Sequence, residues 1–459
     1  METFKNKKIL VVGVGRTGFA LINYFNSIGC DIRVTDQKPI FDLNKAVKKL
    51  KKIKPTPEMT FGEHKDEDFL DADVIVYSSS VSPHLPQLEL ARSHGKEVYG
   101  QFALAYKLCE KPIILICGSY GRTTVANMIG FAMKQDNRSH FIGGTSDNPF
   151  INFYTQYPKQ EVDFVVVEAS VLELQQCVKL KPFVTVFTNI KENPLQKKFK
   201  NYNEYIESKL SLLKNLTPED FLVVNFDSLG NNLQFKQTAA QVLWYSRRSF
   251  VTMNVQNEIQ GTHFHERRIH SHVHCHSEFK VNEMRIVGEK NRENLMAAIT
   301  AAKAIKLSDK AIQTTIEKFP GIPHRIEFVM ERNGVRFYND SKSETMDELV
   351  TTLESFKEPV ILIAGGKETE QGYEDYFDAI EAKVRVLVLV GECKERMNRI
   401  LGDSSQTYLV GSFEESVLIA YQKSRTGDVI LLSPGNSSTD TFRDYEERGN
   451  YFKKLVYQL

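Results

Sequence analysis

The sequence has few cysteines, no long apolar run and no excess of either charge. Each of these absences argues against a class of protein. Lys and Arg number 59 against 58 Asp and Glu, which leaves a net charge of +1. This balance lacks the basic excess that non-specific nucleic-acid binding needs, so we expect no nucleic-acid partner. The six cysteines are scattered and form no CxxC pair. We therefore expect reduced thiols in a cytoplasmic protein rather than a disulfide framework.

Apolar segments are short throughout the chain. No stretch approaches the roughly 20 uninterrupted apolar residues of a membrane span. The first eight residues lead directly into an apolar run, so we expect no signal peptide. With 41% hydrophobic and 25% charged residues, the composition is that of an ordinary globular protein. A chain of 459 residues has room for about two to four domains.

What the sequence does have is a series of continuous Val/Ile/Leu runs, many of which end in small or polar residues. The runs predicted as buried strands are 9–12, 74–77, 113–116, 164–167, 184–187, 221–224, 360–363, 386–390 and 429–432. Helical patterns lie at 123–133, 202–213, 292–304 and 346–356. Strands that alternate with helices predict an α/β fold with parallel sheets, in which ligands bind at the carboxyl ends of strands.

Three α/β domains are predicted, covering residues 1–98, 99–321 and 322–459. The first boundary follows from a polar stretch near residue 98. The second follows from the turn-forming residues 319–323, Phe-Pro-Gly-Ile-Pro, which are typical of a hinge.

A glycine-rich turn, residues 13–18 (Gly-Val-Gly-Arg-Thr-Gly), follows the first strand and opens a helix. In this context its backbone N–H groups can meet a phosphate. Asp36, near the end of the next strand, stands where a dinucleotide fold places its ribose-binding acid. On its own the motif indicates NAD(P), or a turn that needs glycine only for close packing.

A second glycine turn, residues 118–124 (Gly-Ser-Tyr-Gly-Arg-Thr-Thr), has the form of a phosphate-binding loop between a strand and a helix. Backbone amides of such a loop hold the β- and γ-phosphates, and the Thr123 hydroxyl can bind Mg²⁺. Arg122 stands where the usual lysine would be. Because a guanidinium is longer, planar and forked, this replacement is not conservative. The alternative is a relic loop that no longer binds nucleotide.

Three further segments extend these motifs into a pattern that covers nearly the whole chain. They are 321–325 (Gly-Ile-Pro-His-Arg), 333–342 (Asn-Gly-Val-Arg-Phe-Tyr-Asn-Asp-Ser-Lys) and the closing stretch 432–452. With them, the chain resembles the Mur ligases of peptidoglycan synthesis, and most of all the members that add D-glutamate to UDP-N-acetylmuramoyl-L-alanine. The resemblance implies a Rossmann-like UDP-sugar domain, a central P-loop-type ATPase domain with a parallel sheet, and a Rossmann-like amino-acid domain. It thereby replaces NAD(P) with a UDP-sugar as the expected ligand of the first domain.

The activity implied by the resemblance is ATP-dependent amide-bond formation through an acyl phosphate, with ATP and Mg²⁺ required. The expected small-molecule substrates are UDP-N-acetylmuramoyl-L-alanine and D-glutamate. The expected protein is a cytoplasmic monomer.

The resemblance also implies a role for each residue at a matching position. The UDP-sugar would contact Gly15, Arg16, Thr17, Gly18, Asp36, Gln37 and Lys38. ATP would contact Gly118, Ser119, Gly121, Arg122, Thr123, Thr124, Asn291, Asn294, Arg325 and Asp340. The metal ligands would be Thr123, Glu168 and a carbamylated Lys209, with Arg122, Glu168 and Lys209 as the catalytic set. The amino acid would contact Lys342, Ser438 and Tyr445. For Lys209 the alternative is a solvated helix lysine.

Several positions depart from the family pattern. Pro194 replaces a catalytic histidine, and proline has no side-chain donor or metal ligand. Residues 170–173 (Ser-Val-Leu-Glu) replace Ser-Ser-Phe-Gln, Thr145 replaces an asparagine, and 343–345 (Ser-Glu-Thr) replace Ala-Thr-Asn. These changes leave two alternatives open. One is a catalytically impaired nucleotide-sugar-binding protein, and the other is a ligase with a different acid or amino-acid substrate.

One feature has no counterpart in the family pattern. Six of the eleven histidines lie between His263 and His276. In a strand, residues 270, 272, 274 and 276 would share one face, with Cys275 opposite. Such imidazoles could bind Zn²⁺ or Ni²⁺ adventitiously. The alternative is a solvated edge strand of the middle domain.

Overall fold

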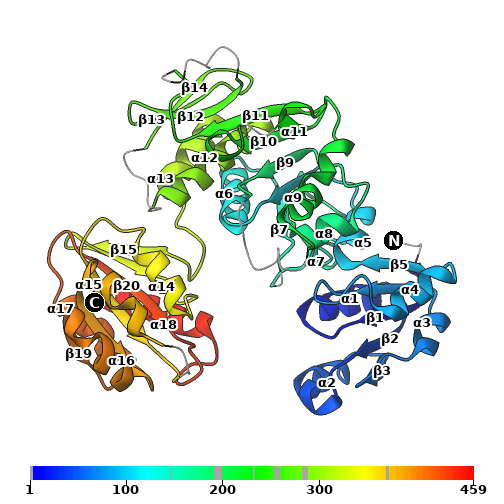
Figure 1. Cartoon of the computed structure of the whole chain (residues 1–459), viewed down its shortest axis with the longest axis horizontal. Coiled ribbons are helices and arrows are strands. Elements are labelled where there is room, and N and C mark those ends of the chain that lie inside the picture. Colours follow the sequence, from blue (N-terminus) through cyan, green and yellow to red (C-terminus); the bar gives the residue numbers. More distant parts are fainter. Residues whose placement is uncertain are drawn as a thin grey trace. The chain divides into compact units, whose positions relative to one another are not determined.

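The computed structural model describes residues 4–145, 147–190, 199–230, 233–251, 253, 259–281, 288–368 and 372–459 (Figure 1). Each of its three sheets belongs to one α/β domain. Tertiary contacts divide the chain into two compact units, one made of residues 1–279 with 296–312 and the other of 280–295 with 313–459. Among the described residues, no helix combines the length and apolarity that crossing a membrane would require.

The first sheet has the strand order β3-β2-β1-β4-β5, and all four pairings are parallel. Its strands are β1 (Lys8–Val12), β2 (Asp31–Asp36), β3 (Glu58–Phe61), β4 (Val74–Tyr77) and β5 (Glu97–Gly100). Its helices are α1 (Arg16–Ser27), α2 (Asn44–Leu50), α3 (Asp66–Asp71) and α4 (Pro86–Ser93). The strand order reverses beside β1, so the glycine turn after β1 lies where such sheets bind ligands. Strand β5 runs across the predicted boundary at residue 98.

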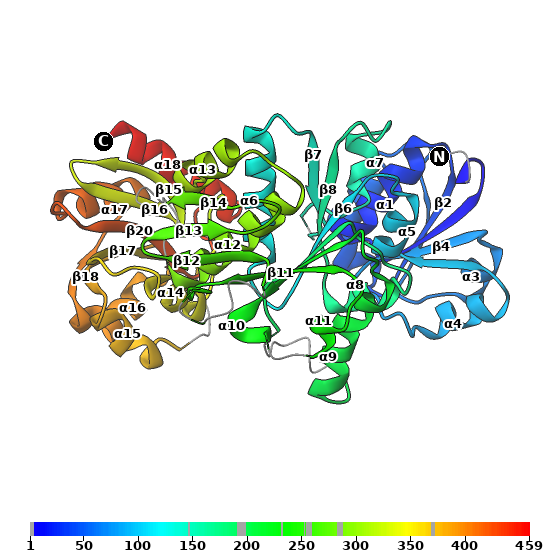
Figure 2. The same cartoon turned by 90° about the horizontal axis from the view of Figure 1, so that it is seen from above.

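The second sheet has nine strands in the order β14-β13-β12-β11-β10-β9-β6-β8-β7. They are β6 (Ile113–Cys117), β7 (His140–Gly143), β8 (Phe164–Glu168), β9 (Val184–Phe187), β10 (Phe221–Asn225), β11 (Gln241–Ser246), β12 (Gly261–His265), β13 (Arg268–Ser271) and β14 (Ser277–Lys280). Pairing is parallel from β7 to β12 and antiparallel between β12 and β13. Strands β11 to β14, in green in Figure 2, extend the parallel core of the sheet to one edge.

The helices of the central region connect these strands. They are α5 (Gln101–Leu108), α6 (Arg122–Gln135), α7 (Asn152–Gln156), α8 (Val171–Gln176), α9 (Tyr202–Leu210), α10 (Phe226–Leu229), α11 (Leu233–Lys236), α12 (Glu289–Ala304) and α13 (Asp309–Lys318). Helix α6 starts directly after the second glycine turn, so its N-terminus faces the carboxyl edge of the sheet.

The third sheet has the order β15-β16-β20-β17-β18-β19 and is parallel except for the β15–β16 pair. Its strands are β15 (Glu327–Arg332), β16 (Val335–Asn339), β17 (Val360–Gly365), β18 (Val384–Val390), β19 (Gln406–Leu409) and β20 (Val429–Gly435). Its helices are α14 (Met346–Leu353), α15 (Phe377–Glu381), α16 (Lys394–Leu401), α17 (Phe413–Gln422) and α18 (Tyr445–Gln458).

The predicted apolar strands are confirmed as β1, β4, β6, β8, β9, β10, β17, β18 and β20, and their central residues are almost fully buried. Three predictions need correction. The helix predicted at 346–356 ends at Leu353. The helix predicted at 202–213 ends at Leu210 and continues as a 3₁₀ turn over Ser211–Asn215. The strand predicted through residues 270–276 is wrong, because β13 ends at Ser271. His274 has φ = 61°, which is left-handed and incompatible with an extended strand.

Candidate active site

The loop between β6 and α6 depends on glycine at two positions. Gly118 has φ = 137°, and a Cβ atom there would lie 2.0 Å from Oγ1 of Thr188. Gly121 has φ = 85° and forms the N-cap of α6. The chain therefore turns sharply from the buried strand into the helix, and the N–H groups of the first turn of α6 remain available to an anion.

Two residues after β9 hold this loop in place. The Thr188 hydroxyl donates to the Tyr120 carbonyl at 2.6 Å, and Asn189 Nδ2 donates to the same carbonyl at 3.0 Å. Asn189 also accepts from the backbone N–H groups of Tyr120, at 3.2 Å through Oδ1, and of Ser119, at 3.1 Å through its carbonyl. The sequence motifs gave neither residue a role. The sequence feature that could have indicated them is their position, as two polar residues directly after the apolar run 184–187.

Thr123, Arg122 and Glu168 meet beside this loop. The Thr123 hydroxyl donates to Glu168 Oε2 at 2.9 Å, and Arg122 Nε lies 3.8 Å from the same oxygen. Arg122 also donates through Nη1 to the Gly118 carbonyl. Glu168 ends β8 and is only 4% exposed. A hydroxyl and a carboxylate are hard oxygen donors of the kind that Mg²⁺ prefers, so this pair fits a magnesium ion.

Lys209 of α9 approaches the same loop. Its side chain is 2% exposed, and Nζ donates to Ser119 Oγ at 3.0 Å and lies 4.5 Å from the Tyr205 ring centre. Burial lowers the pKa of Lys209 to about 8, and the charge of Arg122 acts in the same direction. The alternative of a solvated helix lysine is therefore wrong.

The departures at residues 170–173 and at Thr145 have structural roles. Ser170 and Glu173 form a capping box on α8, in which Ser170 N donates to Glu173 Oε2 at 2.7 Å. Ser79, from the first domain, donates to Glu173 Oε1 at 3.3 Å, and burial raises the pKa of Glu173. Thr145 Oγ1 accepts from the backbone of Asn148 at 3.0 Å. Asn193 and Pro194 lie outside the described residues.

The first glycine turn borders a cavity of about 400 Å³ whose lining includes Gly15, Arg16 and Lys49. Asp36 braces this turn: Oδ2 accepts from the backbone N–H of Val14 at 3.0 Å, and Oδ1 from that of Lys38 at 3.0 Å. The structure thus joins Asp36 to the first glycine turn through Val14 and to Lys38. Gln37 and Lys38 are exposed, Gly18 is buried against the Gly13 carbonyl, and Thr17 is half-buried.

Arg16 connects this turn to the central domain. Its guanidinium forms an ion pair with Asp147, a residue that also lines the cavity. The sequence motifs did not single out Asp147.

In the second compact unit, Asp340 is buried in a set of hydrogen bonds. Its Oδ2 accepts from Ser343 at 2.5 Å, Thr352 at 2.8 Å and Ser433 at 2.8 Å. Its Oδ1 accepts from the backbone N–H of Ile326 at 3.1 Å. Burial raises the pKa of Asp340 to about 6 despite these donors. In this arrangement Asp340 positions the segment that carries Arg325 and Lys342.

The other nucleotide candidates of this unit are Arg325, Asn291 and Asn294. Arg325 is exposed. Asn291 and Asn294 lie in the first turns of α12, where Asn294 Nδ2 donates to Asn291 Oδ1 at 3.4 Å.

The predicted amino-acid contacts lie close together. Lys342 Nζ is 5.3 Å from the Tyr445 ring centre, and the Ser438 N–H donates to Glu344 Oε1 at 3.2 Å. Arg448 lies behind them and is 3% exposed. Its guanidinium donates to both oxygens of Ser341 and to the Asn436 carbonyl. Burial lowers the pKa of Arg448 to about 10. The motifs assigned no role to Glu344 or Arg448.

Comparison with known proteins identifies the family of the chain. Residues 7–100 match the N-terminal domain of MurD-like Mur ligases, residues 116–302 the Mur ligase middle domain, and residues 324–436 the glutamate ligase domain of Mur ligases. The UDP-N-acetylmuramoylalanine–D-glutamate ligase of Bdellovibrio bacteriovorus is 37% identical over 98% of this chain and 97% of its own. The protein of the same name from Geotalea uraniireducens is 34% identical over 99% and 98%.

Solved structures support the fold. UDP-N-acetylmuramate–alanine ligase from Thermotoga maritima superimposes with a TM-score of 0.56 at 15% identity, covering 99% of both chains. A UDP-N-acetylmuramoyl-L-alanyl-D-glutamate–2,6-diaminopimelate ligase gives 0.56 at 16% identity, covering 84% of this chain and 92% of its own. Together with the full-length identity to the curated relatives, these matches establish that the chain belongs to the Mur ligase family.

Proposed function

We propose that this protein is an ATP-dependent ligase that joins D-glutamate to UDP-N-acetylmuramoyl-L-alanine in cytoplasmic peptidoglycan precursor synthesis. The observation that carries the proposal is the convergence of Thr123, Glu168 and Lys209 on the β6–α6 loop. This convergence occurs in a chain whose full-length relatives are named for that reaction.

The β6–α6 loop holds the phosphates of ATP in this proposal. Gly118, Ser119 and Gly121 form the loop around the phosphates, Thr124 supplies a donor in the first turn of α6, and Arg122 supplies the positive charge. Thr123, Glu168 and a carbamate on Lys209 hold Mg²⁺, which when bound neutralises charge on the transferring phosphoryl group. Asn291, Asn294, Arg325 and Asp340 are assigned to the remainder of the nucleotide by family position.

Lys209 is suited to carbamylation because the reaction needs a neutral amine. The amine attacks the carbon of CO₂, an N–C bond forms, and a proton leaves the nitrogen. With a pKa of about 8, about a tenth of the Lys209 side chains are neutral at pH 7. The product is a carbamate, whose negative carboxylate replaces the positive ammonium of Lys209. The ammonium would repel Mg²⁺, whereas the carboxylate can bind it.

The reaction then proceeds in two steps. The substrate carboxylate attacks the γ-phosphorus, the bond to the bridging oxygen of ADP breaks, and an acyl phosphate forms. The amine of D-glutamate attacks the acyl carbon, loses a proton, and expels phosphate as the amide forms. The chain's contribution is to position these groups and to stabilise the phosphoryl charge.

In this proposal the UDP-sugar binds in the first domain and D-glutamate in the third. The UDP-sugar contacts the turn at residues 15–18 together with Asp36, Gln37 and Lys38. The carboxylates of D-glutamate contact Lys342 and Ser438 beside Tyr445, since an anionic substrate needs cationic and hydroxyl donors.

A phosphate-release assay tests the proposal. Release is expected only when UDP-N-acetylmuramoyl-L-alanine, ATP, Mg²⁺ and D-glutamate are all present, with L-glutamate as the matched control. Mass spectrometry should show the dipeptide product. If the UDP-sugar binds and no phosphate is released with any amino acid, the protein is a catalytically impaired nucleotide-sugar-binding member of the family. Release with another amino acid alone would show that the substrate is different.

A further inference from the structure

A cluster of imidazoles occupies the edge of the central sheet, at the strands farthest from β6 on that side. His263 of β12 and His270 of β13 are directly paired across the strands. Their rings stack 5.4 Å apart, His263 stacks on His272 at 5.6 Å, and His272 stacks on His276 at 4.8 Å. The antiparallel pairing and the loop after β13 thus bring together histidines that a single strand would have set in a row.

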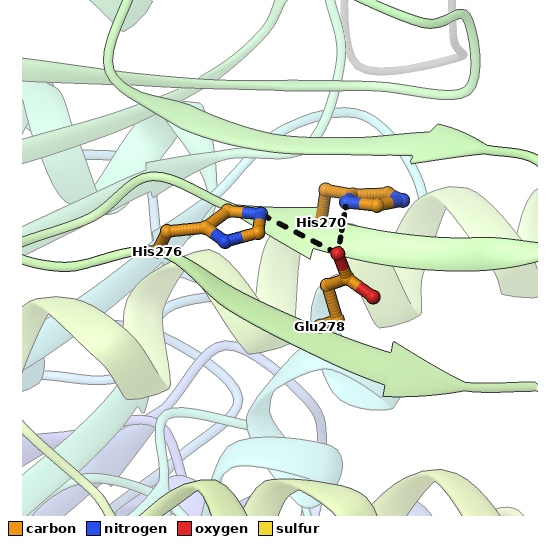
Figure 3. A group of neighbouring side chains, drawn as sticks. All are labelled: His270, His276 and Glu278. Atoms are coloured by element: carbon orange, nitrogen blue, oxygen red, sulfur yellow. Dashed lines mark ion pairs between the residues drawn. The ribbon is translucent and has the colours of Figure 1, made fainter.

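Glu278 of β14 joins this cluster. Its Oε1 lies 3.6 Å from His270 Nδ1 and 3.9 Å from His276 Nε2 (Figure 3). All three ligand atoms lie within 4.8 Å of one another. Arg268 donates to the other carboxylate oxygen, Oε2, at 3.1 Å. Oε1 therefore faces the two imidazoles while its partner oxygen is held by the arginine.

We propose that His270, His276 and Glu278 bind a Zn²⁺ ion, with water at the fourth position. Two imidazole nitrogens and one carboxylate oxygen are a ligand set typical of zinc, whereas Mg²⁺ prefers oxygen ligands alone. The site is separate from the ATP loop, since strands β9 to β12 lie between β13 and β6 in the sheet. It is independent of the proposed ligase reaction.

Two ring nitrogens of the cluster lack a hydrogen-bond partner among the described residues. His270 Nε2 and His263 Nδ1 are buried without a hydrogen-bond partner. Among the residues that the structure describes, Glu278, Arg268 and the exposed Glu266 beside His265 form ion pairs at the cluster.

The geometry needs only side-chain movement. Tetrahedral Zn²⁺ places ligand atoms about 3.3 Å apart. The two distances to Glu278 must shorten by a few tenths of an ångström, and the two nitrogens must approach by up to about 1.5 Å. The side chains of His276 and Glu278 are 50% and 40% exposed and can rotate, whereas His270, at 15%, is held in its strand. A bound Zn²⁺ would link the loop 272–276 and strand β14 to strand β13 through its three protein ligands.

Zinc titration of the full-length chain tests the proposal. The chain is freed of metal with a chelator and titrated with Zn²⁺ in the calorimeter, with excess Mg²⁺ present to fill oxygen-ligand sites. One Zn²⁺ per chain is expected, together with a Zn²⁺-dependent rise in melting temperature. Because loss of a contact that merely supports a metal ligand costs 10–100-fold in affinity, His276→Gln and Glu278→Gln should each weaken binding by at least about tenfold.

The matched control is His274→Asn. His274 lies in the same loop, but its Nε2–H donates to the Ala304 carbonyl oxygen, 3.3 Å away, and its ring lies 5.8 Å from that of Phe221. Asparagine tolerates its left-handed backbone, so Zn²⁺ affinity should stay unchanged. The visible spectrum of bound Co²⁺ should change in the His276 and Glu278 variants alone. Failure of the wild type to bind Zn²⁺, or equal affinity in all three variants, would overturn the proposal.

Discussion

Arg122, the first residue of α6, lies between the Gly118 carbonyl oxygen and the Glu168 carboxylate. It donates to the Gly118 carbonyl and stands 3.8 Å from the Glu168 carboxylate. The guanidinium thus reaches back through Nη1 to the loop that carries it, while its Nε is directed toward Glu168. Substitutions of Arg122 therefore show whether the loop binds ATP with arginine in the place of the usual lysine.

We expect Arg122→Ala to weaken ATP binding and to slow phosphate release by about 100-fold or more, because the charge that stabilises the transferring phosphoryl group is lost. Arg122→Lys should retain activity, since it keeps the charge and the loop keeps its glycines and Thr123. Calorimetry with ATP and the phosphate-release assay measure the two effects. Full activity of the alanine variant would show that Arg122 has no part in phosphoryl transfer.

Lys209 offers a second test at a single residue. Lys209→Ala should abolish phosphate release, and bicarbonate or a short-chain carboxylic acid should restore part of it by supplying the missing carboxylate. The exposed Lys214, one turn further along the chain, provides the control, and Lys214→Ala should be fully active. An active Lys209→Ala variant without any added acid would contradict the carbamate.

The pH dependence of this modification follows from the pKa of Lys209, which burial lowers to about 8. The neutral amine fraction rises as pH increases from 7 to 9, so carbamate formation at fixed dissolved CO₂ should rise through the same interval. An unshifted lysine would form carbamate only nearer pH 10.5. ¹³C NMR with labelled CO₂ measures the occupancy, and a midpoint near 10.5 would contradict the burial argument.

At the scale of elements, the β6–α6 loop depends on its brace from the residues after β9. Gly118→Ala would set a Cβ atom 2.0 Å from Thr188 Oγ1, and this hydroxyl holds the Tyr120 carbonyl. We expect the substitution to weaken ATP binding by at least about tenfold, because backbone strain of this kind costs roughly 1–3 kcal/mol. Calorimetric titration with ATP measures it.

The control for this glycine is Gly411→Ala. The nearest atom to a Cβ atom there is Glu415 Oε2 at 3.5 Å, an ordinary contact, so ATP affinity should not change. Equal affinity in the Gly118 variant would show that the loop adjusts around Thr188.

His263 on strand β12 should make the free energy of unfolding depend on pH in the acid range. Burial lowers the pKa of His263 from 6.5 to about 4, so between these values the unfolded chain binds more protons than the folded one. Stability is therefore lost as pH falls from about 6.5 to 4, by up to about 3 kcal/mol for this group. Thermal unfolding at a series of pH values measures the slope. His263→Phe, which keeps the ring contact with Phe250, should flatten it, whereas the exposed His94→Ala should not.

At the scale of the whole molecule, the first domain is expected to bind a UDP-sugar rather than a dinucleotide. The Arg16–Asp147 ion pair and the Ser79–Glu173 hydrogen bond join it to the central domain. Titration of the full-length chain should show binding of UDP-N-acetylmuramoyl-L-alanine and of UDP, with NADH as the control that binds weakly or not at all. Tighter binding of NADH than of any uridine nucleotide would contradict this prediction.

The strands that could be predicted from the sequence are those buried on both faces. Continuous runs such as 113–116 and 360–363 have no polar face that could lie in water. The sequence pattern alone therefore predicts them as strands buried on both faces. Strands β12 to β15 escaped prediction because they are short or partly exposed, and they form through pairing with neighbours rather than through their own pattern. The same reason explains why the histidine segment was misread as one strand.

The sequence by itself determined the α/β class, the two glycine turns and the family to which the chain belongs, since these depend on residue type at fixed local spacing. Only the tertiary structure decided which residues meet. Thr188 braces a loop 68 residues away, Lys209 is buried against Ser119, and Glu278 faces two histidines. Such contacts depend on strand order and on burial. Burial also moves the pKa of Lys209 and of His263, because the low-dielectric interior disfavours their charged forms.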